Sequence, residues 1–232
     1  MTRSDCVACV AGPGTARTAT ILEQLLVEAR DVGFLGPGPV EIHVRHALAL
    51  ARGVETERGM SSPRCAPPRA VVDLGSGAGV PGLVLALRWP ATSFLLVEAQ
   101  RRRAMFLVRA AQALGLGTRV VVVAQRAEIL GQEPGRRGAF DLVTARSFAR
   151  PAVVAECAAP FLELGGLLVV AEPPSSKPVG ATRWPEAELA KLGMGPARAF
   201  GSEYRFVVLR QESKCPARFP RRIGVPSRHP LF

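Results

Sequence analysis

The sequence feature that most constrains the fold is a glycine-rich stretch at 71–82, which reads Val-Val-Asp-Leu-Gly-Ser-Gly-Ala-Gly-Val-Pro-Gly. Apolar residues on both sides of Asp73 predict a short buried strand. The glycines that follow can adopt positive φ and let the main chain approach a ligand closely. The next residues, 83–88, are apolar and compatible with a helix. A strand, a tight glycine turn and a helix form the first unit of a nucleotide-binding α/β fold.

The ligand of this turn can be inferred from the residues around the glycines. Their spacing lacks the full dinucleotide fingerprint, and no Gly-Lys-Ser/Thr follows that would cradle a phosphate. Asp73 stands near the end of the first strand and Glu98 ends the next one, where a carboxylate can accept both hydroxyls of a ribose. A ligand with a ribose, an amino group and no phosphate suits this pattern. We therefore expect S-adenosylmethionine as the cofactor.

From residue 69 onward, short apolar strands alternate with helices, which predicts a parallel sheet covered on both faces. Ligands of such sheets bind beyond the carboxyl ends of the strands. We therefore expect the glycine turn, Glu98 and the loops after Val123 and Val143 to surround one crevice. The expected strands cover 70–74, 93–98, 119–123, 140–144, 167–171 and 204–210, and the expected helices 81–89, 101–114, 127–130, 151–162 and 184–192.

The chain divides into four parts. Residues 1–14 are expected to form a flexible leader, 15–68 an N-terminal helical extension, 69–212 the main domain and 213–232 a basic tail packed on it. The leader contains Cys6-Val-Ala-Cys9. Disorder is a simpler interpretation of this segment than zinc binding or redox chemistry. His43 and His46 lie three apart on one face of a predicted helix, but a metal would need a third ligand. We expect no metal site.

Composition indicates the kind of partner and the cellular compartment of the protein. The sequence has 30 Lys and Arg against 19 Asp and Glu, and the net charge of +11 indicates a polyanion such as nucleic acid as partner. A coding bias toward arginine is the alternative explanation. No apolar run reaches the roughly 20 residues of a membrane span. The 5 scattered cysteines fit a reducing cytoplasm better than a disulfide scaffold.

Several further motifs resemble the ribosomal small-subunit RNA guanine-N7 methyltransferases, a family once called glucose-inhibited division protein B. Together they cover most of the chain from residue 69 to the C-terminus, in the family's order. The resemblance implies a Rossmann-like, class I S-adenosylmethionine-dependent methyltransferase with a mostly parallel seven-stranded sheet, helices on both faces and an N-terminal helical extension. The motifs lie at 73–82, 102–107, 126–128, 140–148, 160–166, 219–226 and 230–231.

The resemblance also implies roles for particular residues. The residues expected to contact the cofactor are Asp73, Gly75, Gly77, Val80, Glu98, Ala127, Glu128 and Arg146. Three of them have a structural alternative, which is an acceptor for the loop in the case of Asp73, a helix cap in the case of Glu128, and an ion pair with Asp141 or Glu172 in the case of Arg146. The arginines expected to bind RNA phosphates are Arg102, Arg103, Arg221 and Arg222, unless they only form a solvated surface.

The resemblance implies methylation of N7 of a guanine in 16S ribosomal RNA, by a monomer that acts on free RNA or on the 30S particle. The N7 lone pair needs no general base, so we expect positioning groups such as Arg146 and Glu172 on the substrate side. Glu172 stands where the family usually has lysine, and the family's Asn-Leu-Thr motif is absent. A methyltransferase for another RNA or a small molecule, or a non-catalytic RNA-binding assembly factor, therefore stays open as an alternative.

Overall fold

The computed structural model describes residues 16–59, 66–173 and 183–232. Its centre is a seven-stranded sheet in the order β3-β2-β1-β4-β5-β7-β6, in which β1 to β5 are parallel and β7 is antiparallel to both β5 and β6. The predicted mostly parallel seven-stranded sheet is thereby confirmed. The strands are β1 Ala70–Leu74, β2 Ser93–Val97, β3 Val120–Val123, β4 Phe140–Arg146, β5 Leu162–Ala171, β6 Arg198–Phe200 and β7 Phe206–Arg210.

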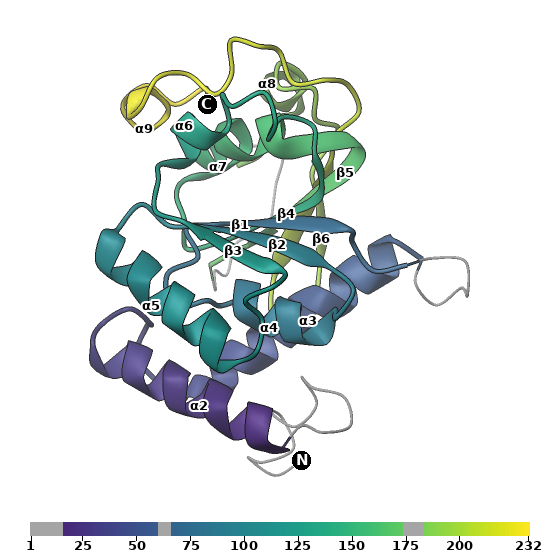
Figure 1. The fold of residues 1–232 in the computed structure, drawn as a ribbon. Coiled ribbons are helices and arrows are strands. Elements are labelled where there is room, and N and C mark those ends of the chain that lie inside the picture. The colour runs from purple at the N-terminus through teal and green to yellow at the C-terminus, as the bar shows by residue number, and fades with distance from the viewer. Residues whose placement is uncertain (1–15, 60–65, 174–182) are drawn as a thin grey trace.

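Helices cover both faces of this sheet (Figure 1). One face carries α2 (Ala16–Asp31), α3 (Val40–Glu57), α4 (Gly82–Arg88) and α5 (Arg101–Ala113). The other carries α6 (Ala127–Leu130), α7 (Pro151–Ala158), a 3-10 turn (Ala159–Phe161), α8 (Glu186–Ala190) and α9 (Val225–Arg228). The buried apolar residues accordingly form two clusters, one on each side of the sheet.

The central strands are buried on both faces, as a parallel sheet between two helical layers requires. Val71 and Val72 of β1 are both fully buried, yet Val71 packs in the cluster under α4 and α5 and Val72 in the cluster under α7. β1 pairs with β2 on one side and with β4 on the other. The direction in which the chain adds strands therefore reverses between β1 and β4, and open α/β sheets bind ligands in the crevice above such a point.

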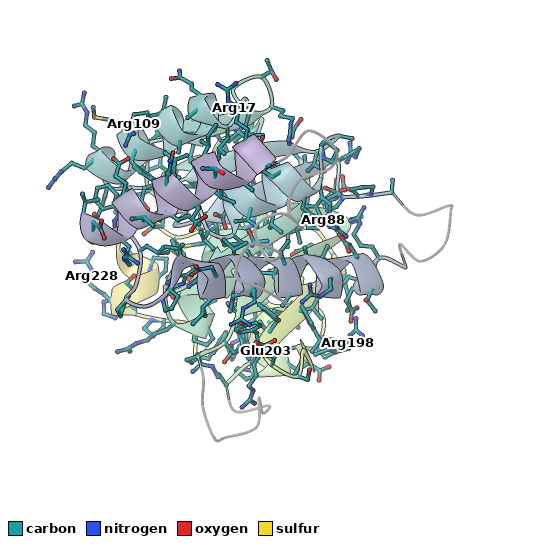
Figure 2. The ribbon with its side chains drawn as sticks, turned by 90° about the horizontal axis from the view of Figure 1, so that it is seen from below. Arg17, Arg88, Arg109, Arg198, Glu203 and Arg228 are labelled. Atoms are coloured by element: carbon teal, nitrogen blue, oxygen red, sulfur yellow. The ribbon has the colours of Figure 1, made fainter. Side chains whose placement is uncertain are left out.

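The two N-terminal helices pack on the same side of the sheet as α4 and α5, with α3 in contact with α4 and β5 and α2 packed against α3. Figure 2 shows α2 and α3 running across that side of the molecule. Leu22 and Leu26 of α2 and Val44 of α3 are buried in the same cluster as residues of α4 and α5. Glu55 of α3 also accepts hydrogen bonds from the α4 side, so α3 is held firmly beside the sheet. This placement brings the start of α3 close to the carboxyl edge of β4 and β5.

Two elements differ from the expectation. β6 is not among the strands predicted from the sequence; it is a three-residue edge strand with no buried side chain, so it leaves no hydrophobic pattern in the sequence. The tail contains the single helical turn α9, which is not among the helices predicted from the sequence. The Cys6–Cys9 motif lies outside the described residues.

Candidate active site

Two cavities adjoin at the carboxyl ends of the parallel strands. Cavity A has a volume of about 310 Å³ and lies above β1, β2 and β3, with Gly75, Glu98 and Glu128 in its wall. Cavity B has a volume of about 580 Å³ and lies above β4 and β5, with Arg146 and Glu172 in its wall. Residues 147–149, which follow β4, line both cavities and form the partition between them.

The glycine turn brings main chain rather than side chains to cavity A. Gly75, Gly77 and Gly79 have φ of 67°, 55° and 87°, a region that is costly for residues with a side chain. A Cβ built on Gly75 would lie 2.7 Å from Cδ2 of Phe148, which belongs to the partition. Glycine at this position therefore allows the partition to rest directly on the turn.

The carboxylate of Asp73 holds the turn against α4. Its Oδ2 accepts a hydrogen bond from the Gly82 amide (3.2 Å) and its Oδ1 accepts one from the Thr144 hydroxyl (2.7 Å). Complete burial raises the pKa of this carboxyl to about 6, against the opposing effect of these hydrogen bonds. Asp73 lines neither cavity, so the structural role left open by the sequence is present. Contact of its carboxylate with the cofactor stays a prediction.

Glu98 lies at the end of β2 and spans the side of cavity A. Its Oε2 accepts from the Gly77 amide (3.0 Å) and its Oε1 from the Gln100 amide (2.7 Å). Each carboxylate oxygen has a second lone pair, so two acceptor positions remain after these bonds. The side chain is thus oriented by backbone donors and can still accept a pair of hydroxyl groups.

Ala127 and Glu128 begin α6, on the far side of cavity A. Glu128 is buried, and its Oε1 accepts from Nη2 of Arg126 (3.0 Å) and from the Gly224 amide of the tail (3.2 Å). Burial acts to raise the pKa of this carboxyl, but the Arg126 and backbone hydrogen bonds outweigh it and leave the pKa below its usual value. Glu128 is therefore an ionised wall residue that also binds the tail.

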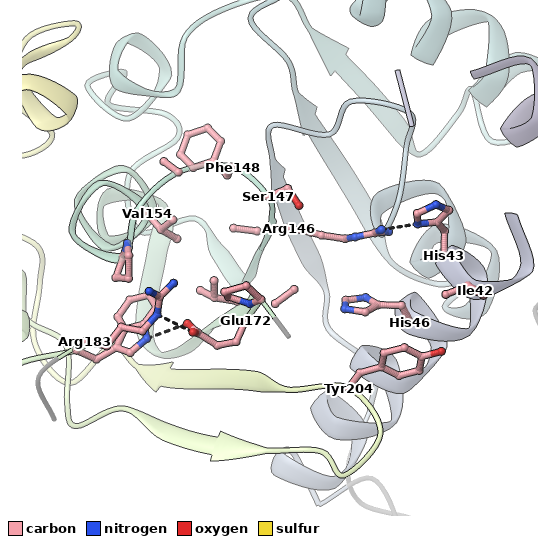
Figure 3. Close-up of a pocket in the computed structure, with 17 residues that line it drawn as sticks. Ile42, His43, His46, Arg146, Ser147, Phe148, Val154, Glu172, Arg183 and Tyr204 are labelled. Atoms are coloured by element: carbon pink, nitrogen blue, oxygen red, sulfur yellow. Dashed lines mark hydrogen bonds and ion pairs between the residues drawn. The ribbon is translucent and has the colours of Figure 1, made fainter. Parts of the chain in front are cut away.

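Arg146 ends β4 and extends across cavity B to α3 (Figure 3). Its Nη2 donates to Nδ1 of His43, whose Nε2 donates to the Gly36 carbonyl at 3.3 Å. The two alternative partners named from the sequence are engaged elsewhere, Asp141 with Arg58 and Glu172 with Arg183. Arg146 is therefore paired with a histidine and not with a carboxylate.

Two buried polar atoms in the wall of cavity B, Nη1 of Arg146 and Nδ1 of His46, have no hydrogen-bond partner among the described residues. Burial lowers the pKa of Arg146, and burial together with Arg146 lowers the pKa of both histidines, that of His46 to about 4. Both imidazoles are therefore neutral at neutral pH. The cavity offers a polar ligand one cationic donor and one neutral imidazole nitrogen.

Glu172 faces cavity B from the end of β5. Its carboxylate accepts from Nε of Arg183 (2.6 Å) and from Nε1 of Trp184 (3.0 Å), as Figure 3 shows. The Glu172 side chain is only 5% exposed, whereas that of Arg183 is 44% exposed. The negative charge noted in the sequence is therefore accompanied by a positive one at the mouth of the cavity. Neither Arg183 nor Trp184 was predicted, because no motif marks them.

The partition has an unusual backbone. Ser147 has φ 54° and is the one residue other than glycine with positive φ in the parts of the chain that the structure describes. A side chain in this region costs roughly 1–2 kcal/mol. Such strain concentrates at functional sites, where the surroundings hold it in place. Here it turns the chain sharply after Arg146 and places Phe148 against the glycine turn.

The four arginines expected to bind RNA are placed differently from one another. Arg102 and Arg222 are exposed. Arg103 lines cavity A and its guanidinium lies 5.7 Å from the ring centroid of Phe34. Arg221 has a partner within the chain: its Nε and Nη2 donate to the fully buried carboxylate of Glu156 at 2.8 and 2.6 Å. Arg221 therefore anchors the tail, and its contact with RNA phosphate stays a prediction.

The described ranges 16–59, 66–173 and 183–232 contain no group of three His, Cys, Asp or Glu side chains arranged to hold a metal ion. Within them no helix is long and apolar enough to cross a bilayer. Cys157 is buried in α7 beside cavity A, and burial raises the pKa of its thiol well above the usual range, so it is a poor nucleophile.

The strand order, the glycine turn and the ligand cavity above β1 define a class I S-adenosylmethionine-dependent methyltransferase. Solved structures share this fold: an O-methyltransferase from Bacillus cereus in complex with SAH superimposes with a TM-score of 0.58 at 16% identity, covering 83% of this chain and 91% of that one. An O-methyltransferase from Streptomyces achromogenes in complex with SAM gives 0.55 at 18% identity, covering 83% and 90%.

The chain belongs to the family rRNA small subunit methyltransferase G, whose model matches residues 39–176. A relative of that name from Prochlorococcus marinus (strain MIT 9303) is 39% identical over 169 residues, which are 71% of this chain and 68% of the relative. Another, from Symbiobacterium thermophilum, is 35% identical over 205 residues, 83% of this chain and 80% of the relative. The resemblance found in the sequence motifs is therefore confirmed.

Proposed function

We propose that this chain transfers a methyl group from S-adenosylmethionine to N7 of a guanine in 16S ribosomal RNA. The observation that carries the proposal is the pair of adjoining cavities at the carboxyl edge of the sheet, one suited to a nucleoside and one to a base. The names of the family and of its relatives, which specify small-subunit rRNA, support the choice of substrate.

The residues of cavity A fit an adenosyl group. Its volume is in the range of small-ligand pockets. We assign the ribose hydroxyls to Glu98, the adenine edge to Ala127 and Glu128, and the methionine part to the main chain at Gly75 and Gly77. The resemblance also implies Val80 as a ligand contact, although this residue is buried in the core and lies outside the lining of cavity A. When bound, S-adenosylmethionine supplies an electrophilic methyl group on a positively charged sulfur.

The residues of cavity B fit a guanine. Nη1 of Arg146 can donate to the O6 carbonyl, and the Glu172 carboxylate can accept from the N1–H and N2 amino groups. Phe148, Trp184 and Tyr204 give the cavity aromatic surface of the kind on which extruded bases stack. Both contacts would leave N7 open toward the partition and cavity A.

The proposed reaction requires no base from the protein. The N7 lone pair is already available in neutral guanine, so the neutral histidines of cavity B need not accept a proton. Alignment of two reactants can lower a barrier by roughly 7–11 kcal/mol. The guanine becomes cationic as the methyl group arrives and S-adenosylhomocysteine leaves, and the carboxylate of Glu172 lies in the same cavity to stabilise that charge. Arg146 and Glu172 are thus the substrate-side contacts.

We further propose that the protein acts in the cytoplasm as a monomer, on free rRNA or on the 30S particle. The high positive charge suits a polyanionic substrate of either kind. The test of the function is methyl transfer by the purified chain, with labelled S-adenosylmethionine and small-subunit rRNA from cells that lack the gene. Mass spectrometry of the digested RNA should then show one additional N7-methylguanosine per rRNA.

Each other outcome assigns the chain differently. A labelled nucleoside other than N7-methylguanosine would contradict the choice of target atom. Transfer to another RNA or to a small molecule, with rRNA unlabelled, would contradict the choice of substrate. Tight RNA binding without any transfer would contradict the enzyme and indicate an assembly factor that has kept the fold.

A further inference from the structure

We infer that the C-terminal tail is a wall of the cofactor site, and that Ser227 contacts the adenosyl group. The inference rests on the proposed function for cavity A and adds a binding residue to it. The family model matches residues 39–176 and ends before the tail begins. Figure 1 shows α9, which carries Ser227, beside α6 at the upper edge of the molecule.

The tail reaches cavity A through the carboxylate of Glu128. The Gly224 amide donates to Oε1 of Glu128 at 3.2 Å, directly before α9 begins. Gly224 has φ 76°, and this left-handed residue turns the chain from the anchored part of the tail into α9. Ser227 then lies in the wall of cavity A together with Arg126 and Glu128. The Glu128 carboxylate therefore lines cavity A and also binds the tail segment beside it.

The tail is held in this position by buried interactions. Arg221 donates its amide and its guanidinium to the fully buried Glu156 of α7. Arg137 donates to main-chain carbonyls of the tail, among them that of Phe219 at 2.6 Å. Phe219 itself is 4% exposed. A segment with this many contacts is a built part of the domain.

The chemistry of Ser227 suits the edge of an adenine or a ribose. A hydroxyl group can both donate and accept, and adenine presents an amino donor beside ring-nitrogen acceptors. The other side chains at this end of cavity A are already paired with each other, Arg126 with Glu128. Ser227 is exposed in the structure, so a larger side chain at this position can fold and will occupy part of the cavity.

The first test is calorimetric titration of the full chain with S-adenosylhomocysteine. We expect Ser227→Phe to raise the Kd about tenfold or more, which corresponds to roughly 1.4 kcal/mol. The matched control is Ser202→Phe, an exposed serine in the β6–β7 loop outside cavity A, which should stay within about twofold of the unaltered chain. If Ser227→Phe binds as tightly as Ser202→Phe, the inference is wrong. If the unaltered chain does not bind, the proposed function fails first.

The second test needs no substitution and therefore does not depend on how a variant folds. Trypsin can cleave the tail after Arg222 and Arg228, which are exposed on either side of the Ser227 wall. Saturating S-adenosylhomocysteine should slow both cleavages several-fold. Cleavage after Lys191, which directly follows α8, should be unchanged. Tail cleavage at the same rate with and without bound ligand would overturn the inference.

Discussion

The carboxylate of Glu98 combines two tasks, since it binds the glycine turn through the Gly77 amide and, on the proposed function, binds the ribose. Glu98→Gln replaces one acceptor oxygen with an amino group that cannot accept. Hydrogen bonds to charged groups contribute roughly 1.5–3 kcal/mol, so the Kd for S-adenosylhomocysteine should rise about 10- to 100-fold. The control in calorimetry is Glu163→Gln, near the start of β5, which is the end of that strand away from the cavities. Equal affinities for both variants would contradict the role of Glu98.

Glu172 can be tested separately from the cofactor. In Glu172→Gln the amide oxygen still accepts from Trp184, but the negative charge beside Arg183 and the base is lost. We expect kcat/KM for rRNA to fall about tenfold or more, since one charged hydrogen bond is removed, with the Kd for S-adenosylhomocysteine unchanged. The control is Glu188→Gln on α8. Turnover at the unaltered rate would remove Glu172 from the substrate site.

His46 makes a prediction about pH. Its pKa is lowered by burial, and then by Arg146 and His43, from 6.5 to about 4 in the folded chain. The unfolded chain thus binds the proton more readily, so this residue's contribution to stability is complete above pH 6.5 and is lost as the pH falls toward 4. His46→Gln lacks this dependence. Across that interval the advantage of the unaltered chain should shrink by on the order of 1–2 kcal/mol, allowing for partial solvent screening.

Urea unfolding of both chains at several pH values measures this difference. The raised pKa of Asp73 acts in the opposite direction over part of the range, because the folded chain then binds the proton more readily. Asp73 is the same in both chains, so its effect cancels in the comparison. A difference in unfolding free energy that stays constant with pH would show that His46 is not buried as described.

The cavity-lining residues that could be predicted from the sequence are those that follow directly from a strand end. Gly75, Glu98 and Arg146 belong to this group, because the carboxyl ends of parallel strands meet at one edge whatever the details of packing. Arg183 and Ser227 come from segments that reach the cavities only through tertiary contacts. Their positions depend on the Glu172 and Glu128 carboxylates, and no spacing in the sequence encodes those pairings.

At the level of helices and strands, the sequence predicted those elements that are buried by at least one face. α5 is an example, with Phe106, Leu107 and Ala110 buried on one side. One available signal was missed. Glu156 is the one acid in the apolar helix α7, and a buried carboxylate needs a cation, which should have suggested Arg221 or another basic tail residue as its partner.

The anchoring of the tail by this pair gives an element-level prediction. Arg221→Ala leaves the carboxylate of Glu156 buried without its cation, which should lower the free energy of unfolding by roughly 3 kcal/mol. The double variant Glu156→Leu/Arg221→Met removes both charges and should recover most of that loss. Chemical denaturation measures both. An Arg221→Ala chain as stable as the original would mean that the tail is not held by this contact.

At the scale of the whole molecule, positive charge gathers where cavity A opens. Arg101, Arg102 and Arg103 form the first turn of α5, which starts directly after β2 at the carboxyl edge of the sheet. A helix N-terminus favours acidic residues, and α5 has none in its first turn. The three arginines therefore lower the stability of the helix. A polyanion bound across this first turn would offset that cost. Arg222, an exposed residue of the tail that precedes α9, adds to the basic surface.

This distribution of charge predicts which arginines meet RNA. Each phosphate contact releases about one counterion, so the slope of log Kd against log salt counts the contacts. Arg102→Ala and Arg222→Ala should each reduce that slope by roughly 0.7–0.9 and weaken binding of small-subunit rRNA. Arg17→Ala removes an equally exposed charge from α2, on the underside seen in Figure 2, and should leave the slope unchanged. If all three variants lowered the slope equally, RNA binding would depend on net charge alone. The carboxyl edge of the sheet would then not be the RNA-binding face.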